Sequence, residues 1–254
     1  MHSDPHKILI KVPEITALFW ITKILATTFG ETAGDALSMS LNLGYLVSTL
    51  IFAVIFISFL YVQIRSKSYR PVFYWSTIIA STTVGTTLAD FVDRSLGIGY
   101  VGGSTLLLSL VLISLYSWYK TEHSISPYSV NSPRVEIFYW ITITFSQTLG
   151  TALGDWSADT AGLGYSGGII LYSSLILLIL VLHYRSKISN TLLFWAAFIL
   201  TRPLGAVVGD FLDKPLDHGG LNLSRFTASF VLLVAICLFA YWSNKLSKKS
   251  QTTA

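Results

Sequence analysis

One phrase recurs four times along this chain of 254 residues: a tryptophan, nine residues, a glycine, three residues, a small residue and an aspartate. The copies run from Trp20 to Asp35, from Trp75 to Asp90, from Trp140 to Asp155 and from Trp195 to Asp210. A repeat of this kind marks supersecondary units that are stable only when packed on one another. The repeat therefore predicts a scaffold that brings the four aspartates together.

The composition predicts that this scaffold lies in a membrane. Hydrophobic residues make up 52% of the chain and charged residues only 12%, whereas a soluble domain carries about 25% charged residues. A helix needs about 20 apolar residues to cross a bilayer. Eight such segments lie at roughly 14–37, 43–64, 70–93, 99–119, 135–158, 164–184, 190–213 and 221–243. The predicted fold class is an all-α integral membrane protein with eight transmembrane helices.

The distribution of basic residues predicts the topology. They gather at both termini and in three links that follow the even segments: Lys7, Lys11, Arg65, Lys67, Arg70, Lys120, Arg134, Arg185, Lys187, Lys245, Lys248 and Lys249. This pattern places both termini on the cytoplasmic side of a bacterial inner membrane and argues against nucleic acid as a partner. The expected parts are a cytoplasmic segment 1–13, repeats 14–120, a cytoplasmic loop 121–134, repeats 135–244 and a tail 245–254.

Each copy is expected to be a hairpin of one odd and one even helix. Because a hairpin contains two spans, all four copies point the same way, which predicts pseudo-rotational symmetry about the membrane normal. An aromatic pair opens each odd helix, so the tryptophans are expected in the interfacial belt. The glycine-rich links lie on the opposite side, where Tyr45, Tyr100 and Tyr165 are expected to pack.

These tandem hairpins, each with its tryptophan and its Gly-x-x-x-small-Asp end, resemble a bacterial membrane-protein family defined by a tandem repeat of unknown function. Members of that family are catalogued as uncharacterised membrane-anchored proteins. The resemblance covers residues 14–244. It implies the eight-helix architecture and no particular activity.

Steps of four residues back from each aspartate keep side chains on one stripe of a helix. The four stripes are Lys23, Thr27, Glu31 and Asp35; Ile78, Thr82, Thr86 and Asp90; Ile143, Gln147, Thr151 and Asp155; and Phe198, Arg202, Ala206 and Asp210. The motif glycines form a small-xxx-small strip beside each stripe, which lets membrane helices approach closely. We therefore expect the odd helices to form an inner ring and the even helices to face lipid.

The carboxylates of this ring predict a hard cation as the ligand. Charges inside a bilayer require a partner, water or a proton, and Asp, Glu and Thr oxygens suit Mg²⁺, Mn²⁺ or Ca²⁺. The predicted function is a proton-coupled transporter of a divalent cation such as Mn²⁺ or Mg²⁺, with no covalent cofactor and unknown oligomeric state. The predicted site contains Glu31, Asp35, Asp90, Asp93, Asp155, Asp159, Asp210 and Asp213, with Asp35, Asp90, Asp155 and Asp210 as metal ligands.

Lys23 and Arg202 are the basic residues inside the spans and are the predicted charge partners. Lys23 could instead extend to the cytoplasmic interface. Arg202 lies near mid-membrane and precedes Pro203, so we expect it to pair with an acid such as Glu31 or to contact the transported species.

Other interpretations stay open at this point. The aspartates could simply mark helix ends, with Arg94 and Lys214 as local counter-ions, in a scaffold or sensor that transports nothing. An enzyme is not expected, because the acidic zone contains only His218 as an imidazole, and the single cysteine, Cys237, excludes a two-cysteine metal site. A chromophore bound to Lys23 is a further, less favoured alternative.

Overall fold

The structure is a computed structural model that describes the backbone of residues 10–253 and the side chains of residues 10–246. Over these residues it contains eight long α-helices and no strand, as predicted. The helices are α1 (Ala17–Asp35), α2 (Gly44–Arg65), α3 (Pro71–Asp90), α4 (Gly99–Glu122), α5 (Pro133–Asp155), α6 (Gly164–Arg185), α7 (Asn190–Asp213) and α8 (Arg225–Thr253). Lys7 and the side chains of Lys248 and Lys249, which entered the predicted topology, lie outside the described residues.

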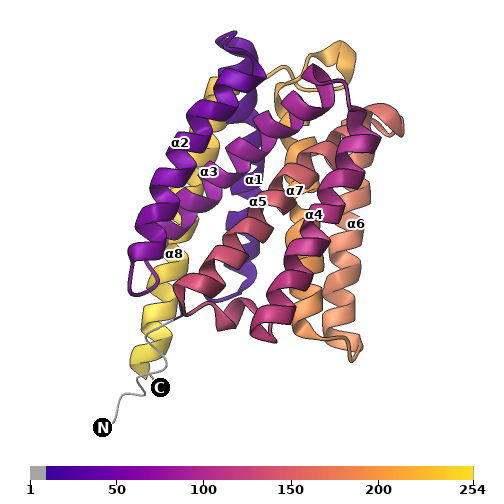
Figure 1. Cartoon of the computed structure of the whole chain (residues 1–254). Helices are drawn as coiled ribbons and strands as arrows, with labels where there is room; N and C mark the ends of the chain where they lie inside the picture. The colour runs from indigo at the N-terminus through magenta and orange to yellow at the C-terminus, as the bar shows by residue number, and fades with distance from the viewer. Residues whose placement is uncertain (1–9, 254) are drawn as a thin grey trace.

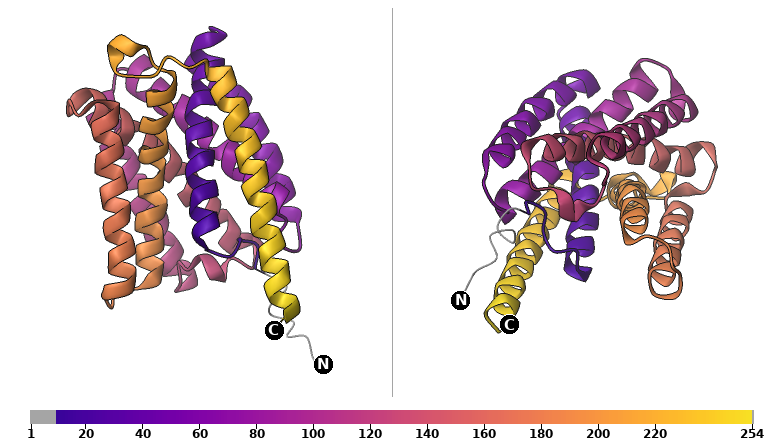
Figure 2. Two further views of the ribbon diagram at one scale, coloured as in Figure 1. Left: turned by 180° about the vertical axis from the view of Figure 1, so that it is seen from behind. Right: turned by 60° about the horizontal axis from the view of Figure 1, so that its bottom comes forward.

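The four odd helices form a closed inner ring in the order α1, α3, α5, α7 and back to α1. Their polar and small side chains are buried between them, which is the arrangement that the stripes predicted. The even helices lie outside this ring (Figures 1 and 2).

Each even helix packs mainly against the odd helix of the next copy. Helix α2 lies on α3, α4 on α5, α6 on α7, and α8 closes the circle on α1. The two helices of each copy therefore pack mainly on helices of other copies rather than on each other. Each odd helix has a ring neighbour on both sides. The even helix therefore packs on the outside of the ring, against the odd helix of the following copy.

The links after α1, α3 and α5 share one conformation. Each begins with a five-residue π-helical turn, at Ala36–Ser40, Phe91–Ser95 and Trp156–Thr160. The next helix then starts at a glycine with positive φ, for example Gly99 at 73°, a conformation that only glycine adopts without strain. The fourth copy differs: α7 continues without a π-helical turn to Asp213 and is followed by a 3₁₀ turn, Leu216–His218.

The links α2–α3, α4–α5 and α6–α7, which carry the basic residues, all lie at one end of the bundle, and the motif aspartates lie toward the other (Figure 1). Helix α8 extends beyond the predicted boundary at residue 244. No glycine or proline follows Arg225 within α8 to stop it.

Five helices, α2, α4, α6, α7 and α8, are long and apolar enough to span a membrane. Helices α1, α3 and α5 are not among these five; their buried faces carry threonine and glycine, and α1 also carries Lys23 and Glu31. The outer helices present large apolar side chains to the surroundings: Val54 is 67% exposed, Leu177 59% and Phe230 68%.

An aromatic cluster fills the interior at the basic end of the ring. Trp75, Trp140 and Trp195 are at most 4% exposed, and Trp195 Nε1 donates a hydrogen bond of 2.8 Å to the backbone oxygen of Ile125. Tyr74 and Tyr139 join their hydroxyls at 2.7 Å. For these three tryptophans the expectation of an interfacial belt is wrong, because they are buried against aromatic side chains of the neighbouring odd helices. Trp20, the fourth motif tryptophan, is only partly buried.

Candidate functional site

The motif glycines are seats for side chains of the neighbouring helix. A Cβ atom on Gly30 would overlap Thr82, one on Gly150 would overlap Arg202, and one on Gly205 would overlap Thr27. Gly85 receives Gln147 in the same way, with the Gln147 backbone 3.0 Å from such a Cβ. The stripe residue eight positions before each aspartate thus packs on the first motif glycine of the adjacent copy, all around the ring.

Glu31 and Arg202 form a buried ion pair at the centre. Arg202 Nη2 lies 3.0 Å from Glu31 Oε2, and the two side chains are 0% and 3% exposed. The same nitrogen donates to Thr86 Oγ1 at 2.6 Å and to Thr151 Oγ1. Because these four residues come from α1, α7, α3 and α5, the guanidinium ties together the whole inner ring. This is the pairing that the sequence suggested for Arg202.

Above this pair, two basic side chains divide the four motif aspartates into two sets. Arg94 lies 3.1 Å from Asp90 and 3.0 Å from Asp155, so it joins α3 to α5. Lys214 lies 2.5 Å from Asp35 and 3.1 Å from Asp210, so it joins α1 to α7. Arg94 and Lys214 each follow their own motif aspartate by four residues, and the two bridges are therefore equivalent.

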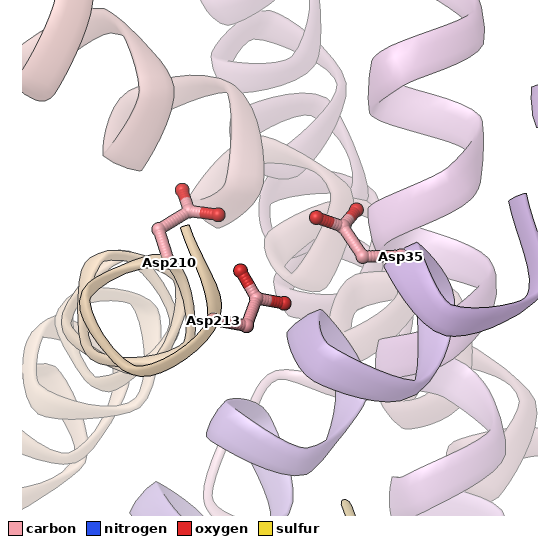
Figure 3. Close-up of side chains that lie close together, drawn as sticks. All are labelled: Asp35, Asp210 and Asp213. Atoms are coloured by element: carbon pink, nitrogen blue, oxygen red, sulfur yellow. The ribbon is translucent and has the colours of Figure 1, made fainter. Parts of the chain in front are cut away.

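A third acid joins the set at Lys214. Carboxylate oxygens of Asp35, Asp210 and Asp213 all lie within 4.8 Å of one another and could hold a metal ion. Figure 3 shows the three carboxylates directed toward a shared space between α1 and the end of α7. Among the described residues these are the three carboxylates that lie this close together. Asp90 and Asp155, the other two predicted metal ligands, lie outside this group, so a single site made from all four motif aspartates stays a prediction.

The remaining predicted acids lie apart from this group. Asp93 packs against Gly103 with both carboxylate oxygens buried and without a hydrogen bond among the described residues. Asp159 is exposed and accepts a hydrogen bond of 3.3 Å from the Tyr100 hydroxyl. Neither is placed to share a ligand with Asp35.

A family model described as Repeat of Unknown Function (DUF347) matches four stretches of this chain, residues 18–69, 73–124, 138–189 and 193–245. The chain belongs to this family. Each DUF347 repeat contains one odd helix and the even helix that follows it, which confirms the resemblance inferred from the motif. A search of curated proteins and a search of solved structures each found no match.

Lys23, in the first DUF347 repeat, has no acidic partner among the described residues, so its predicted role as a charge partner is wrong. The side chain is 0% exposed and therefore does not reach solvent. Its Nζ donates to Thr201 Oγ1 at 3.3 Å and lies 3.9 Å from the centre of the Phe198 ring. The stripe positions level with it on α3 and α5 are isoleucines, which offer it no acceptor.

We expect Lys23→Met to raise the free energy of unfolding by about 1–3 kcal/mol, because it removes a buried polar group that has one weak acceptor. Thermal unfolding of the purified chain, followed by tryptophan fluorescence, measures this change. Lys187→Met, at an exposed position in the α6–α7 link, is the control and should have little effect. A lower stability for Lys23→Met would contradict the expectation.

Three contacts of the DUF347 repeats were not foreseen from the sequence. The hydroxyls of Tyr45 and Tyr100 accept hydrogen bonds of 3.1 Å from Arg94, so these tyrosines hold the bridge as well as packing. Arg225 Nε lies 3.1 Å from Asp213 Oδ2. The sequence could have indicated the Arg225 contact, because Arg225 is one of the few basic residues on the acidic side.

A separate polar cluster lies at the basic end. Glu136 is fully buried and accepts from Lys11 Nζ at 2.6 Å and from Gln63 Nε2 at 3.0 Å. The Lys11 ammonium also donates to the backbone oxygen of Ile64. Sequence spacing gave no sign of this cluster, because its members come from the segment before α1, from α2 and from α5.

Proposed function

We propose that this chain is an integral membrane protein whose even helices face lipid. Two observations support it: five helices have the length and hydropathy of membrane spans, and the outer helices expose large apolar side chains that water would solvate poorly. The basic links at one end favour that end as the cytoplasmic side of a bacterial inner membrane.

We propose further that it transports a hard divalent cation, such as Mn²⁺ or Mg²⁺. The observation that carries this is the convergence of Asp35, Asp210 and Asp213. Asp35 Oδ1 and Asp213 Oδ1 are buried and have no hydrogen-bond partner among the described residues. Carboxylate oxygens are the ligands that hard divalent cations prefer, and unsatisfied ones inside a protein attract such a ligand.

We propose that the site opens to its surroundings next to Asp213. An open pocket of about 420 Å³ borders Asp213 and is lined also by Ser40, Asn222 and Arg225. Below the site, the Glu31–Arg202 pair occupies the middle of the ring. We propose that a cation enters from the pocket, binds the three aspartates and passes the central pair, with protons compensating the charge of carboxylates that lose their cation.

Asparagine variants test this function. We expect Asp35→Asn, Asp210→Asn and Asp213→Asn each to reduce divalent-cation flux about tenfold or more, since each removes one charged ligand from a site of three. The measurement is ⁵⁴Mn²⁺ uptake or efflux in vesicles or cells containing the full chain. Asp217→Asn is the matched control, because Asp217 is exposed in the neighbouring 3₁₀ turn. Unchanged flux and metal content in all three site variants would reject the transport function.

A scaffold or sensor is the second candidate, and the ion pairs favour it specifically. Arg94 and Lys214 neutralise motif aspartates on adjacent helices, as a purely structural ring would require. In that case the same asparagine variants lower the abundance or melting temperature of the protein and change no cation flux. Measuring protein level and flux on the same samples separates the two functions.

A further inference from the structure

The Lys214 ammonium contacts two of the three carboxylates that would bind the cation. Its Nζ is 2.5 Å from Asp35 Oδ2 and 3.1 Å from Asp210 Oδ1, and these two residues belong to the group that includes Asp213. We propose that Lys214 competes with the transported ion for these carboxylates. Its ammonium pairs with them when no ion is bound, and the ion binds only when the ammonium leaves. This inference rests on the proposed transport function.

The ammonium and a divalent ion exclude each other on geometric and electrostatic grounds. A hard divalent ion contacts carboxylate oxygens at about 2.0–2.6 Å. An ammonium at its present distance from Asp35 Oδ2 would share that oxygen with the ion, so two cations would lie a few ångströms apart in a poorly solvated place. Repulsion at such a separation is strong.

The local charge favours a divalent ion as the replacement. Three carboxylates face two positive groups, Lys214 and Arg225, and this leaves one negative charge. A divalent ion in place of the ammonium, with Arg225 unchanged, brings the group to neutrality. A monovalent ion in the same exchange would leave the charge as it was.

The side chain of Lys214 can leave while its backbone stays. Its amide donates to Asp210 O at 2.9 Å and its carbonyl accepts from Asn222 N at 2.9 Å, which fixes the main chain. The residue follows the last residue of α7, and its side chain is 13% exposed. A lysine stem has four rotatable carbons and carries a point charge, so it moves out without loss of a fixed fork geometry.

The equivalent residue Arg94 does not have these properties. Its guanidinium has four partners, Asp90, Asp155, Tyr45 and Tyr100. No third carboxylate joins Asp90 and Asp155 among the described residues to form a ligand group. Arg94 is therefore a fixed bridge, and it supplies a control at the matching position of another repeat.

Mn²⁺ binding to the purified full chain tests the inference, measured as loss of the free Mn²⁺ electron paramagnetic resonance signal. We expect Lys214→Met to bind Mn²⁺ about tenfold or more tightly than the wild type. Lys214→Arg keeps the positive charge and should show no such gain. Arg94→Met should show none either, because it frees only two carboxylates. Lys214→Gln is measured as a second uncharged variant, so that the test does not depend on Lys214→Met alone.

The outcomes separate this inference from the proposed function. If the wild type binds and transports Mn²⁺ but the uncharged variants bind it equally or more weakly, the competitor role is wrong and transport stands. If neither the wild type nor the uncharged variants bind Mn²⁺, both proposals fall. Tighter binding in both uncharged variants, with no gain in Lys214→Arg and Arg94→Met, establishes the competition.

Discussion

Replacing Arg202 by methionine is expected to lower the free energy of unfolding by about 3–5 kcal/mol, the usual cost of removing one partner from a buried ion pair. The substitution leaves the Glu31 carboxylate with only the weak 3.4 Å contact from Thr86 among the side-chain hydrogen bonds described. It also removes the donor that joins Thr86 and Thr151 across the ring. Denaturant or thermal unfolding of the purified full chain, followed by tryptophan fluorescence, measures the loss.

A double-mutant cycle shows whether the loss belongs to the pair. Glu31→Gln alone leaves a buried guanidinium without its carboxylate, whereas Glu31→Gln with Arg202→Met removes both charges, so the double variant should lose much less than the sum of the single changes. Arg134→Met is the control, because Arg134 pairs with Glu122 at an exposed position and such pairs contribute little. Additive losses in the cycle would show that the pair does not couple α1 to α7.

Gly205→Ala is expected to destabilise the ring by about 1–3 kcal/mol or more, the cost of overpacking a close helix contact. The new Cβ would lie 2.6 Å from Thr27 Cβ and 2.8 Å from the Thr27 backbone carbon. A change of side-chain rotamer cannot relieve a clash with backbone, so α1 and α7 must separate. Because Glu31 and Arg202 lie on these two helices, the separation also weakens the central ion pair. The melting temperature of the purified chain reports the effect.

Gly34→Ala is the matched control for Gly205→Ala. Its Cβ would meet only the side chain of Thr86, 2.9 Å from Cγ2 and 3.0 Å from Cβ. The second repeat already has alanine at the corresponding position, Ala89. Gly34→Ala should therefore cost clearly less than Gly205→Ala. Equal losses for the two variants would show that the seat geometry does not decide the packing.

The four copies share the first motif glycine and the aspartate and differ in the side chains at equivalent positions around them. The seat at the first motif glycine receives a threonine in two copies, glutamine in one and Arg202 in one. Four residues after the motif aspartate the copies carry Met39, Arg94, Asp159 and Lys214. The central pair and the two bridges arise at these divergent positions, so the function we propose depends on the asymmetry of the repeats.

The sequence alone was sufficient to predict the elements and the inward faces. A fixed Trp-to-Gly-to-Asp spacing and eight apolar segments predicted eight helices with an inner ring of odd ones, because helical periodicity assigns residues four apart to one face. The position of Arg202 near mid-membrane similarly suggested a pair with an acid such as Glu31. These are consequences of spacing along single helices, which a sequence displays directly.

Which residues meet across helices was decided only by the tertiary structure. The sequence did not show that each even helix packs on the next copy, that Asp213 joins Asp35 and Asp210, that Lys23 has no acid beside it, or that three of the four motif tryptophans fill the interior. All of these depend on helix rotation and on which grooves remain free once the ring has closed. Helix rotation and the free grooves follow from the packing of all eight helices together. A single ammonium or guanidinium between two helices then determines which carboxylates can share a ligand.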